Sequence, residues 1–456
     1  MSKALTGSVV DNHSGRLRAL SVIIACVVLA GCVAQNVTPD IAALSPDLES
    51  PELNAQNAAL SLDEEAPAVV ASKATKPNTK ATINTDTPRD YKFVAKAKFD
   101  LPALNQDFPS TFGFSGNNID HLLLGGGAPW QSQPSNNAGQ VTTPLVLNAG
   151  RLFYGDVRGG LHAVSASNGA LLWTVRLFDS KAFQPIATLF ADQNVLYAAT
   201  QNGHVVAISS KTGSVRWKKK AIGSGKNSVT GALRSVGKAL LLQTGNNRLL
   251  TLAKDDGEAG WVYKSTHPIE ALAVSDGTIK LLTSKNEFVH LDESTGKQKT
   301  KNEFPSALEA RQLIATSKDL IVSGKNGLSR YTPQRTRKLW QQKKGDEGQI
   351  IASGDTIFSS GADNVLRAYN RTNGKLNWRS KLLENKANGA LTRWSRPILA
   401  GGRLHLASNT GYVASFNADD GKLILLRNIK APINSAPIVA SGRLYIIAAN
   451  GRVFRL

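Results

Sequence analysis

Short apolar runs recur after residue 90, each bounded by glycine, asparagine or aspartate. Three kinds of run follow one another in a fixed order, and eight copies of each can be counted. One set reads TTPLVLNA, GRLFYGD and GGLHAVSA, and the next reads IATLFAD, NVLYAAT and NGHVVAIS. Short or alternating apolar runs between turn residues are typical of β-strands and not of helices. The pattern therefore predicts an all-β protein.

A fourth run follows a turn glycine and usually carries a tryptophan four residues later, as at Gly169 and Trp173. Successive copies of this position are 44, 44, 39, 40, 38 and 47 residues apart. The position is held by Trp173, Trp217, Trp261, Thr300, Trp340, Trp378 and Leu425. A period near 40 with four strands per repeat indicates propeller blades, because paired-helix solenoids of that period would need helical spacing. We predict an eight-bladed β-propeller of four-stranded antiparallel blades.

The eighth copy contains only three strands, because the sequence stops at Leu456. An unpaired sheet edge there would invite pairing with another chain. Residues 91–101, YKFVAKAKFDL, alternate apolar and mostly charged side chains, which is typical of a half-buried strand. We expect this N-terminal strand to become the outer strand of the eighth blade and to close the ring. The alternative is an isolated strand or an amphipathic arm.

The N-terminus begins with a pattern typical of secretion. Arg16 and Arg18 precede the apolar run Ala19 to Ala30, which is too short to cross a bilayer and ends in LAGC at Cys32. LAGC resembles the lipobox of bacterial lipoproteins, in which the cysteine is diacylated. The resemblance implies lipidation of Cys32 and, because Val33 follows it, anchoring in the outer membrane facing the periplasm. The alternative is an ordinary signal peptide with a chance cysteine.

The stretch behind Cys32 is predicted to be a flexible tether. From residue 33 to residue 90 it contains no Phe, Trp, Tyr or Gly, and it has nine acidic and four basic residues. Such a composition cannot bury enough apolar surface to offset the entropy of ordering. A flexible linker of this length spans roughly 40 Å. The predicted divisions are a signal peptide at 1–31, the lipidated cysteine and tether at 32–90, and the propeller at 91–456.

No catalytic, metal or cofactor site is predicted. The chain has two cysteines, of which Cys26 would leave with the signal and Cys32 would carry lipid, so neither a disulfide nor a cysteine-bound metal is expected. The seven histidines show no spacing typical of metal ligands. The glycine-rich LLLGGGAPWQ lacks the strand and helix of a nucleotide-binding loop, and we interpret it as an irregular entry segment. In that segment, Trp130 is expected to cover the first blade or the end of the ring.

The repeat resembles the pyrroloquinoline-quinone-type propeller repeat. VRGGLHAVSASNGALLWTV and TQNGHVVAISSKTGSVRWKK are close to its consensus. In that family the outer-strand tryptophan docks against the neighbouring blade near a turn glycine. The resemblance implies a structural, blade-docking role for Trp173, Trp217, Trp261, Trp340 and Trp378.

With its lipobox and eight such blades, the chain resembles the BamB family of outer-membrane-protein assembly factors over about residues 140–456. The last two blades carry the resemblance best, and Leu425 stands where that family tends to lose its seventh-blade tryptophan. Thr300 and Thr336 depart from the repeat, since they replace a blade tryptophan and a turn glycine. The resemblance implies a non-enzymatic scaffold lipoprotein of the β-barrel assembly machinery, with no cofactor. Its implied partners are the periplasmic domains of the barrel-insertion protein BamA and unfolded outer-membrane proteins, and the chain is expected to be a monomer within a hetero-oligomeric complex.

The longest predicted loops join one blade to the next, and long loops on a rigid ring are the natural place for partner contacts. In the BamB family the contact surface lies on the loops leading into the fourth and fifth blades. Carried over by blade alignment, the resemblance implies that the partner contacts His267, Glu270, Glu309 and Arg311. The arginine and the paired aspartates that the family has on this surface are missing here. Two other functions stay open: a quinone-dependent dehydrogenase-like protein, although the vicinal cysteine pair of those enzymes is absent, and a propeller that binds cell-wall polymer or polysaccharide.

The formal net charge is +20, and because the tether is acidic the positive charge is concentrated after residue 90. Nucleic acid is not an expected partner of a periplasmic lipoprotein. The charge favours anionic lipid headgroups, lipopolysaccharide or acidic chains, and the alternative is a generally basic, soluble surface. The densest basic loop contains Lys218, Lys219, Lys220 and Lys226.

Overall fold

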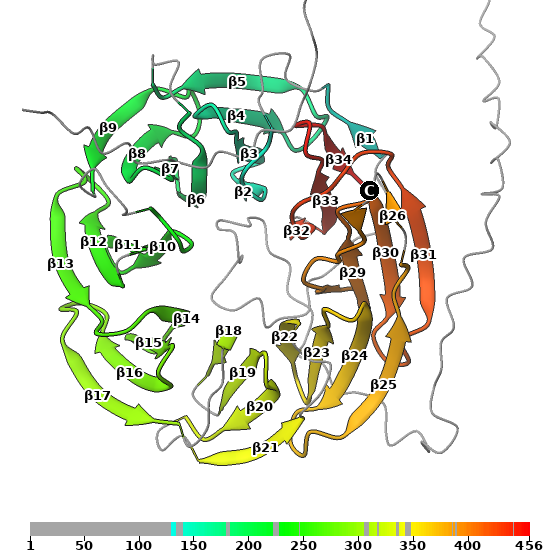
Figure 1. Cartoon of the computed structure of the whole chain (residues 1–456). Coiled ribbons are helices and arrows are strands. Elements are labelled where there is room, and N and C mark those ends of the chain that lie inside the picture. Colours follow the sequence, from blue (N-terminus) through cyan, green and yellow to red (C-terminus); the bar gives the residue numbers. More distant parts are fainter. Residues whose placement is uncertain are drawn as a thin grey trace, which may run out of the picture. The chain divides into compact units, whose positions relative to one another are not determined.

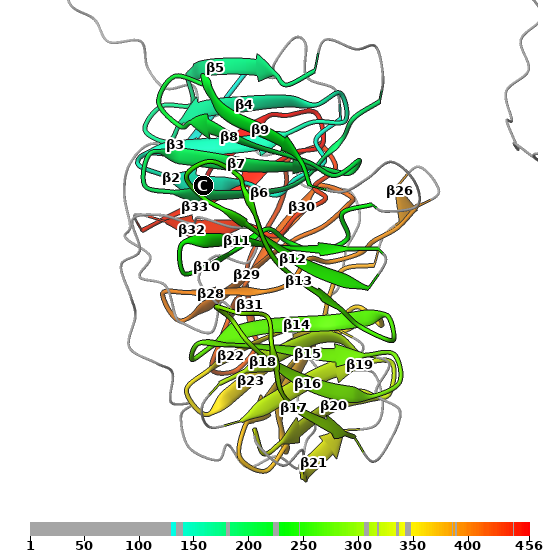
Figure 2. The same cartoon turned by 90° about the vertical axis from the view of Figure 1, so that its left-hand side faces the viewer.

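Eight four-stranded antiparallel sheets form the blades of a closed ring, seen along its axis in Figure 1 and from the side in Figure 2. The computed structural model describes residues 129–133, 140–178, 183–221, 228–245, 247–304, 310–316, 319–333, 337–342, 348–384, 386–387, 390–440 and 442–456. All of them lie in the unit Pro77–Leu456. Their regular structure is entirely β, which confirms the predicted eight-bladed propeller. No helix long and apolar enough to span a membrane occurs among these residues.

Each blade starts at the ring's centre and ends at its outer wall. Blades 1 and 2 consist of β2 (Val146–Asn148), β3 (Arg151–Gly155), β4 (Gly160–Ser165) and β5 (Leu171–Arg176), then β6 (Ile186–Asp192), β7 (Val195–Thr200), β8 (His204–Ser209) and β9 (Val215–Lys220). Blades 3 and 4 consist of β10 (Arg234–Val236), β11 (Ala239–Thr244), β12 (Arg248–Ala253) and β13 (Ala259–Lys264), then β14 (Ile269–Ser275), β15 (Thr278–Thr283), β16 (Glu287–Asp292) and β17 (Gln298–Glu303).

The second half of the ring repeats this order. Blades 5 and 6 consist of β18 (Ala310–Ala315), β19 (Leu320–Gly324), β20 (Gly327–Tyr331) and β21 (Lys338–Gln342), then β22 (Gln349–Ser353), β23 (Thr356–Ser360), β24 (Val365–Asn370) and β25 (Leu376–Lys381). Blade 7 consists of β28 (Ile398–Ala400), β29 (Arg403–Ala407), β30 (Tyr412–Asn417) and β31 (Leu423–Asn428). Blade 8 consists of β32 (Ile438–Ala440), β33 (Arg443–Ile447), β34 (Val453–Arg455) and β1 (Trp130–Gln131). A small hairpin, β26 (Lys386–Ala387) and β27 (Ala390–Leu391), lies between blades 6 and 7.

The core lies between the blades, because both faces of the second and third strands are covered by neighbours. This explains why those strands are nearly continuous apolar runs, while the outer strands alternate and are mostly exposed. Phe153 and Leu161 of blade 1, for example, belong to one buried cluster with Leu189 and Leu196 of blade 2. The blades are therefore held to one another by apolar packing as well as by their outer tryptophans.

An outer-strand tryptophan packs on a turn glycine of the next blade at six of the eight seams. Trp378 is 2% exposed, and its Nε1 donates a hydrogen bond to the Ala418 carbonyl at 3.0 Å. Its ring lies on Gly421, which has a φ of 72°, and a Cβ built there would be 2.5 Å from a ring carbon. The same arrangement joins Trp173 to Gly213, Trp217 to Gly257, Trp261 to Gly296 and Trp340 to Gly374.

The sixth such tryptophan is Trp130, and it closes the ring. Strand β1 pairs with β34 as the outer strand of blade 8, and the Trp130 ring lies on Gly169 of blade 1. The closing strand is thus not the predicted 91–101, which lies outside the described residues. Trp130 stands one repeat period before Trp173, which is the sequence position expected for the tryptophan of the preceding blade.

The other two seams lack a tryptophan for different reasons. At the seam of blades 4 and 5, Thr300 is exposed, and Phe304 packs instead between Phe288 and Tyr331, with ring centroids 5.5 and 4.6 Å apart. At the seam of blades 7 and 8, Leu425 is 44% exposed. The outer strand of blade 8, β1, comes from the other end of the chain, so no turn joins it to β34. A tryptophan at the Leu425 position of β31 would therefore have no turn to pack on.

A buried charge cluster reinforces the seam of blades 5 and 6. The Asp319 carboxylate is fully buried and accepts hydrogen bonds from Nε and Nη2 of Arg371, both at 2.9 Å, and from Nε of Arg330 at 2.8 Å. Burial alone would raise the pKa of Asp319, but the two guanidinium groups hold it below its ordinary value of 3.8. Asp319 is therefore ionised in the folded protein.

Replacing Trp378 by alanine should lower the free energy of unfolding by about 3–5 kcal/mol, since a buried indole leaves a cavity between blades 6 and 7. Leu425→Ala, at the equivalent position of blade 7, is the matched control and should change it by less than about 1 kcal/mol, since Leu425 is 44% exposed. Urea unfolding of both variants measures the difference. If both substitutions lower the free energy of unfolding equally, the tryptophan does not stabilise the seam more than the exposed leucine does.

Asp319→Asn should destabilise the protein by about 3–5 kcal/mol at neutral pH, because it leaves two arginines at a site built for a carboxylate. The folded pKa lies below the unfolded value, so the stabilisation is present above pH 3.8 and is lost as the pH falls through the folded pKa. Urea unfolding at neutral and at acidic pH should therefore show the deficit shrinking in acid. Asp363→Asn, which removes a more exposed pair with Arg367, is the control. A deficit that is independent of pH would refute the role of the charge.

Candidate partner-binding surface and central cavity

Three of the four residues predicted to bind a partner lie where the chain enters blades 4 and 5. His267 lies in the loop between β13 and β14, Glu270 is the second residue of β14, and Arg311 is the second residue of β18. Glu309 lies outside the described residues. Arg311 is exposed, whereas His267 and Glu270 are partly buried. The structure thus groups these positions at two neighbouring blades.

His267 belongs to a hydrogen-bonded cluster with a buried carboxylate. Its Nδ1 lies 3.0 Å from Oε2 of Glu287, and the same oxygen accepts a hydrogen bond from Thr283. The other carboxylate oxygen of Glu287, Oε1, forms an ion pair with Lys301. Burial would raise the pKa of Glu287, but the hydrogen bonds from Lys301 and His267 hold it below its ordinary value. The cluster fixes the loop into blade 4 on the third strand of that blade.

Glu270 ties blade 4 to blade 5. Its Oε2 accepts a hydrogen bond from the backbone N–H of Ala310, the first residue of β18, at 2.9 Å. Comparable side-chain-to-backbone bonds cross other seams, from Thr142 to Ile186, Gln243 to Ile269, Gln312 to Ile350 and Ser360 to Ser395. The Glu270 carboxylate therefore has a structural contact in addition to any role towards a partner.

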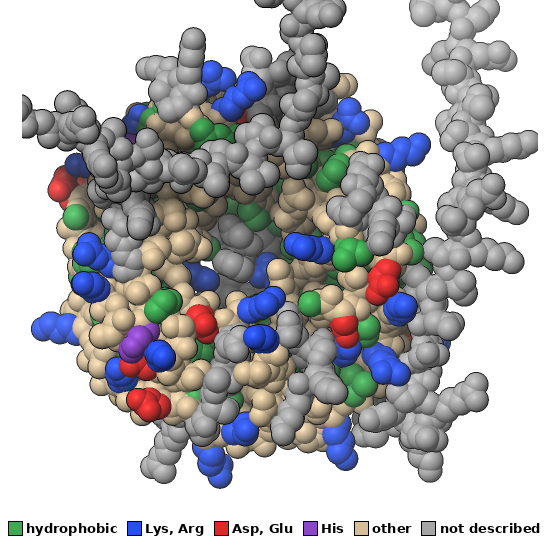
Figure 3. Space-filling model, viewed as in Figure 1, with side chains coloured by type: hydrophobic (Ala, Val, Ile, Leu, Met, Phe, Trp, Pro, Cys, Tyr) green, Lys and Arg blue, Asp and Glu red, His purple; other side chains and the backbone are tan. Residues whose placement is uncertain are grey.

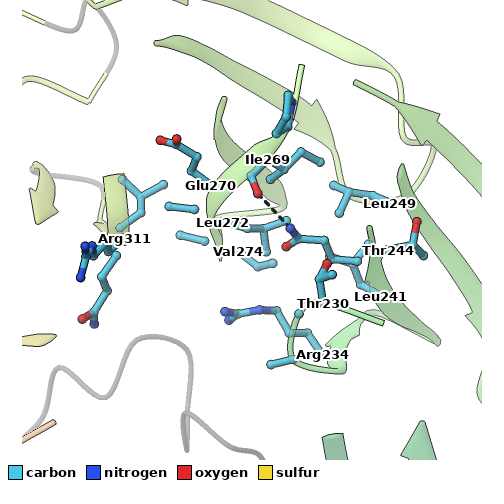
Figure 4. A pocket seen from close by; sticks show the side chains of 18 of the residues that line it. Thr230, Arg234, Leu241, Thr244, Leu249, Ile269, Glu270, Leu272, Val274 and Arg311 are labelled. Carbon is cyan, nitrogen blue, oxygen red and sulfur yellow. Dashed lines mark hydrogen bonds between the residues drawn. The ribbon is translucent and has the colours of Figure 1, made fainter. Parts of the chain in front are cut away.

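A cavity of about 520 Å³ opens among the inner strands of blades 3, 4 and 5. Figure 4 shows Glu270 and Arg311 reaching it from neighbouring strands, with Arg234 entering from blade 3. His267 does not line the cavity, although the adjacent Pro268 does. Its apolar wall is formed by side chains that include Leu241, Leu249, Ile269, Leu272, Val274 and Leu313.

The cavity has a positive interior. Burial lowers the pKa of Arg234 to about 10, and burial together with the charge of Arg234 lowers the pKa of Arg396 to about 10. Both guanidinium groups therefore stay charged at neutral pH. With Arg311, they outnumber Glu270, the one carboxylate among the lining residues that the structure describes, and make the cavity better suited to anionic than to cationic groups. Among the described residues no set of three or more His, Cys, Asp or Glu side chains is placed to hold a metal ion.

The sequence did not single out Arg234, Arg396 or Gln243. All three are polar residues within or beside apolar runs of the inner strands. A polar residue in such a run was the feature of the sequence that could have indicated them. Apolar side chains exposed on the inter-blade loops were also missed, namely Phe183, 66% exposed, and Leu391, 63% exposed. Leu391 belongs to the hairpin of β26 and β27, which projects from the ring in Figure 2. These side chains add apolar contacts to the loop face.

Comparison with known proteins identifies the family. A family model described as outer membrane protein assembly factor BamB matches residues 123–271, 180–361, 264–393 and 362–456. BamB from Yersinia pestis is 24% identical over 319 residues, covering 57% of this chain and 81% of that protein. BamB from Burkholderia pseudomallei is 24% identical over 328 residues, covering 60% of this chain and 83% of that protein.

Solved structures share the fold. The crystal structure of BamB from Moraxella catarrhalis has a TM-score of 0.56 at 18% identity, covering 72% of this chain and 97% of that one. The quinohemoprotein alcohol dehydrogenase of Comamonas testosteroni has a TM-score of 0.61 at 12% identity, covering 77% of this chain and 80% of that one. At such identities these likenesses establish the propeller alone, whereas the family model spans all eight blades. The chain therefore belongs to the family of the outer membrane protein assembly factor BamB.

Proposed function

We propose that this chain is a non-enzymatic scaffold of the machinery that folds and inserts β-barrel proteins into the outer membrane. The observation that carries the proposal is the match of the BamB family model along the whole ring. The ring itself supports a binding role, since it holds long inter-blade loops on a rigid frame. The likeness to a quinohemoprotein dehydrogenase concerns the fold and supports no second function.

The partner we propose is the barrel-insertion protein BamA, contacted through its periplasmic domains. The contact surface consists of the loop face at blades 4 and 5, where the exposed cation of Arg311 and the ring of His267 are presented on strands and loops that hydrogen bonds hold in place. Apolar side chains exposed on the same face, such as Leu391, supply further contact area. The other surfaces of the ring stay available for unfolded outer-membrane proteins.

The proposed location is the outer membrane, with the ring in the periplasm. The sequence LAGC supports cleavage after residue 31 and lipidation of Cys32. The acidic, glycine-free stretch behind it would act as a tether between the lipid and the ring. The anchor would keep the ring near its partner while the loop face turns towards it.

Arg311→Glu should reduce the amount of BamA recovered with this protein from native membranes about tenfold or more, since it reverses a charge at the centre of the surface. Arg379→Glu, on the outer strand β25, is the matched control and should leave recovery unchanged. Affinity capture followed by quantification of BamA makes the measurement. If Arg311→Glu recovers as much BamA as the wild type, the proposed contact surface is wrong. If the wild type recovers no BamA, the proposed scaffold function is wrong.

Two substitutions at Glu270 separate its structural contact from binding. In Glu270→Gln the amide oxygen can still accept the hydrogen bond from Ala310, so the melting temperature should stay close to that of the wild type. Glu270→Ala removes the acceptor and should lower the melting temperature. If BamA recovery falls with Glu270→Gln at unchanged stability, the charge itself contributes to binding.

A further inference from the structure

The outer strands of the ring have an unusual charge balance. The seven strands β5, β9, β13, β17, β21, β25 and β31 contain 12 lysines and arginines and one acidic residue, Glu303. Side chains alternate along a strand, so the face that carries the tryptophan packs on the next blade and the opposite face points to solvent. Figure 3, which views the face with β26, shows Lys and Arg side chains around the periphery of the ring. The outer wall is therefore positively charged.

One arc of this wall, formed by β5, β9 and β13, combines cations with exposed aliphatic side chains. We call it the basic wall and define it by the exposed side chains that alternate with the tryptophan positions: Leu172, Thr174, Arg176, Arg216, Lys218, Lys220, Val262 and Lys264. These three strands contain no acidic residue. Figure 1 shows β5, β9 and β13 following one another along the outer edge of the ring.

On β17, the outer strand of the next blade, the lysines form ion pairs with carboxylates. There Lys299 pairs with Asp292 at 2.9 Å, and Lys301 pairs with Glu287. On β9, Lys219 pairs with Glu258 at 2.5 Å, but it lies on the face that carries Trp217. On the opposite face, Lys218 donates to a neutral acceptor, the Leu177 carbonyl, and lies 3.8 Å above the Phe178 ring. The wall thus retains a local excess of positive charge.

That excess acts on a neighbouring titratable group. Burial lowers the pKa of His204, and the charges of Lys218 and Lys220 lower it further. His204 begins β8, next to β9, so the positive potential of the wall extends into the blade.

The aliphatic side chains decide which kind of anion the wall suits. Leu172 is 45% exposed and Val262 is 59% exposed. An acidic polymer or a nucleic acid would pair with the cations but would leave these side chains in water. A membrane offers both anionic headgroups and an acyl boundary that takes up aliphatic side chains.

We propose that the basic wall is a docking surface for a membrane with negatively charged phospholipid headgroups. The wall lies at the circumference of the ring, so docking through it leaves the loop face and the central cavity open to a protein partner. A basic surface also adds a second membrane signal to a lipid chain, and two signals give stable attachment where one gives reversible binding. The inference goes beyond the proposed function and requires no BamA.

The test uses residues 32–456 with Cys32→Ser, which lack the apolar run of the signal peptide and cannot be lipidated, and measures their binding to phosphatidylcholine vesicles with and without phosphatidylglycerol. The protein should bind the phosphatidylglycerol vesicles at low salt and be released at high salt. The fourfold variant R176Q/R216Q/K220Q/K264Q should bind about tenfold more weakly or worse. The matched control K338Q/R379Q/K381Q/R427Q removes four exposed cations from β21, β25 and β31 and should bind within about twofold of its parent. Equal melting temperatures establish that both variants fold.

A second variant distinguishes a membrane from an acidic polymer. L172S/V262S keeps every cation and should weaken binding to the phosphatidylglycerol vesicles while leaving binding to soluble polyglutamate unchanged. The proposal is overturned if the control variant loses as much vesicle binding as the wall variant, which would indicate a general charge effect. It is also overturned if L172S/V262S binds the vesicles normally, or if the parent protein does not bind them. Because BamA is absent, none of these results bears on the proposed scaffold function.

Discussion

The packing of an outer-strand tryptophan on a turn glycine of the next blade is the contact on which the ring depends. A four-stranded blade cannot bury both of its faces alone, so it needs neighbours at a fixed angle and distance. The indole supplies both a large apolar surface and a hydrogen bond to a carbonyl three residues before the glycine, as Trp378 does with Ala418 and Gly421. The glycine is required because a side chain would occupy the place of the ring.

The two seams without a tryptophan follow from the same constraint. Blade 4 has Thr300 at the tryptophan position, and in the sequence repeat Thr336 takes the place of the turn glycine of blade 5, so both partners of the contact are replaced together. At blade 7, Leu425 faces a blade whose last strand comes from the other end of the chain. The first of these seams borders the surface proposed to bind BamA. Glu270 and Phe304 hold that seam in place of the tryptophan.

The period of the repeat made most of the fold predictable. Strand order, blade number and tryptophan positions all follow from turns and apolar runs that recur near every 40 residues. The closing strand was placed wrongly because residues 91–101 carry a clear local alternation, whereas Trp130 lies in a glycine-rich stretch and is recognised only by its distance from Trp173. The cavity and the contact of Glu270 could not be predicted, since both depend on how far apart neighbouring blades lie.

The most direct test of this account is to restore the missing contact. Thr300→Trp and Thr336→Gly should be made singly and together, and the free energy of unfolding should be measured for each by urea titration. Thr300→Trp alone should give no gain in the free energy of unfolding, and the pair should show a favourable coupling of about 2 kcal/mol, as expected for a newly buried aromatic ring. Additive effects of the two substitutions, or a full gain from Thr300→Trp alone, would contradict the requirement for a glycine beneath the ring.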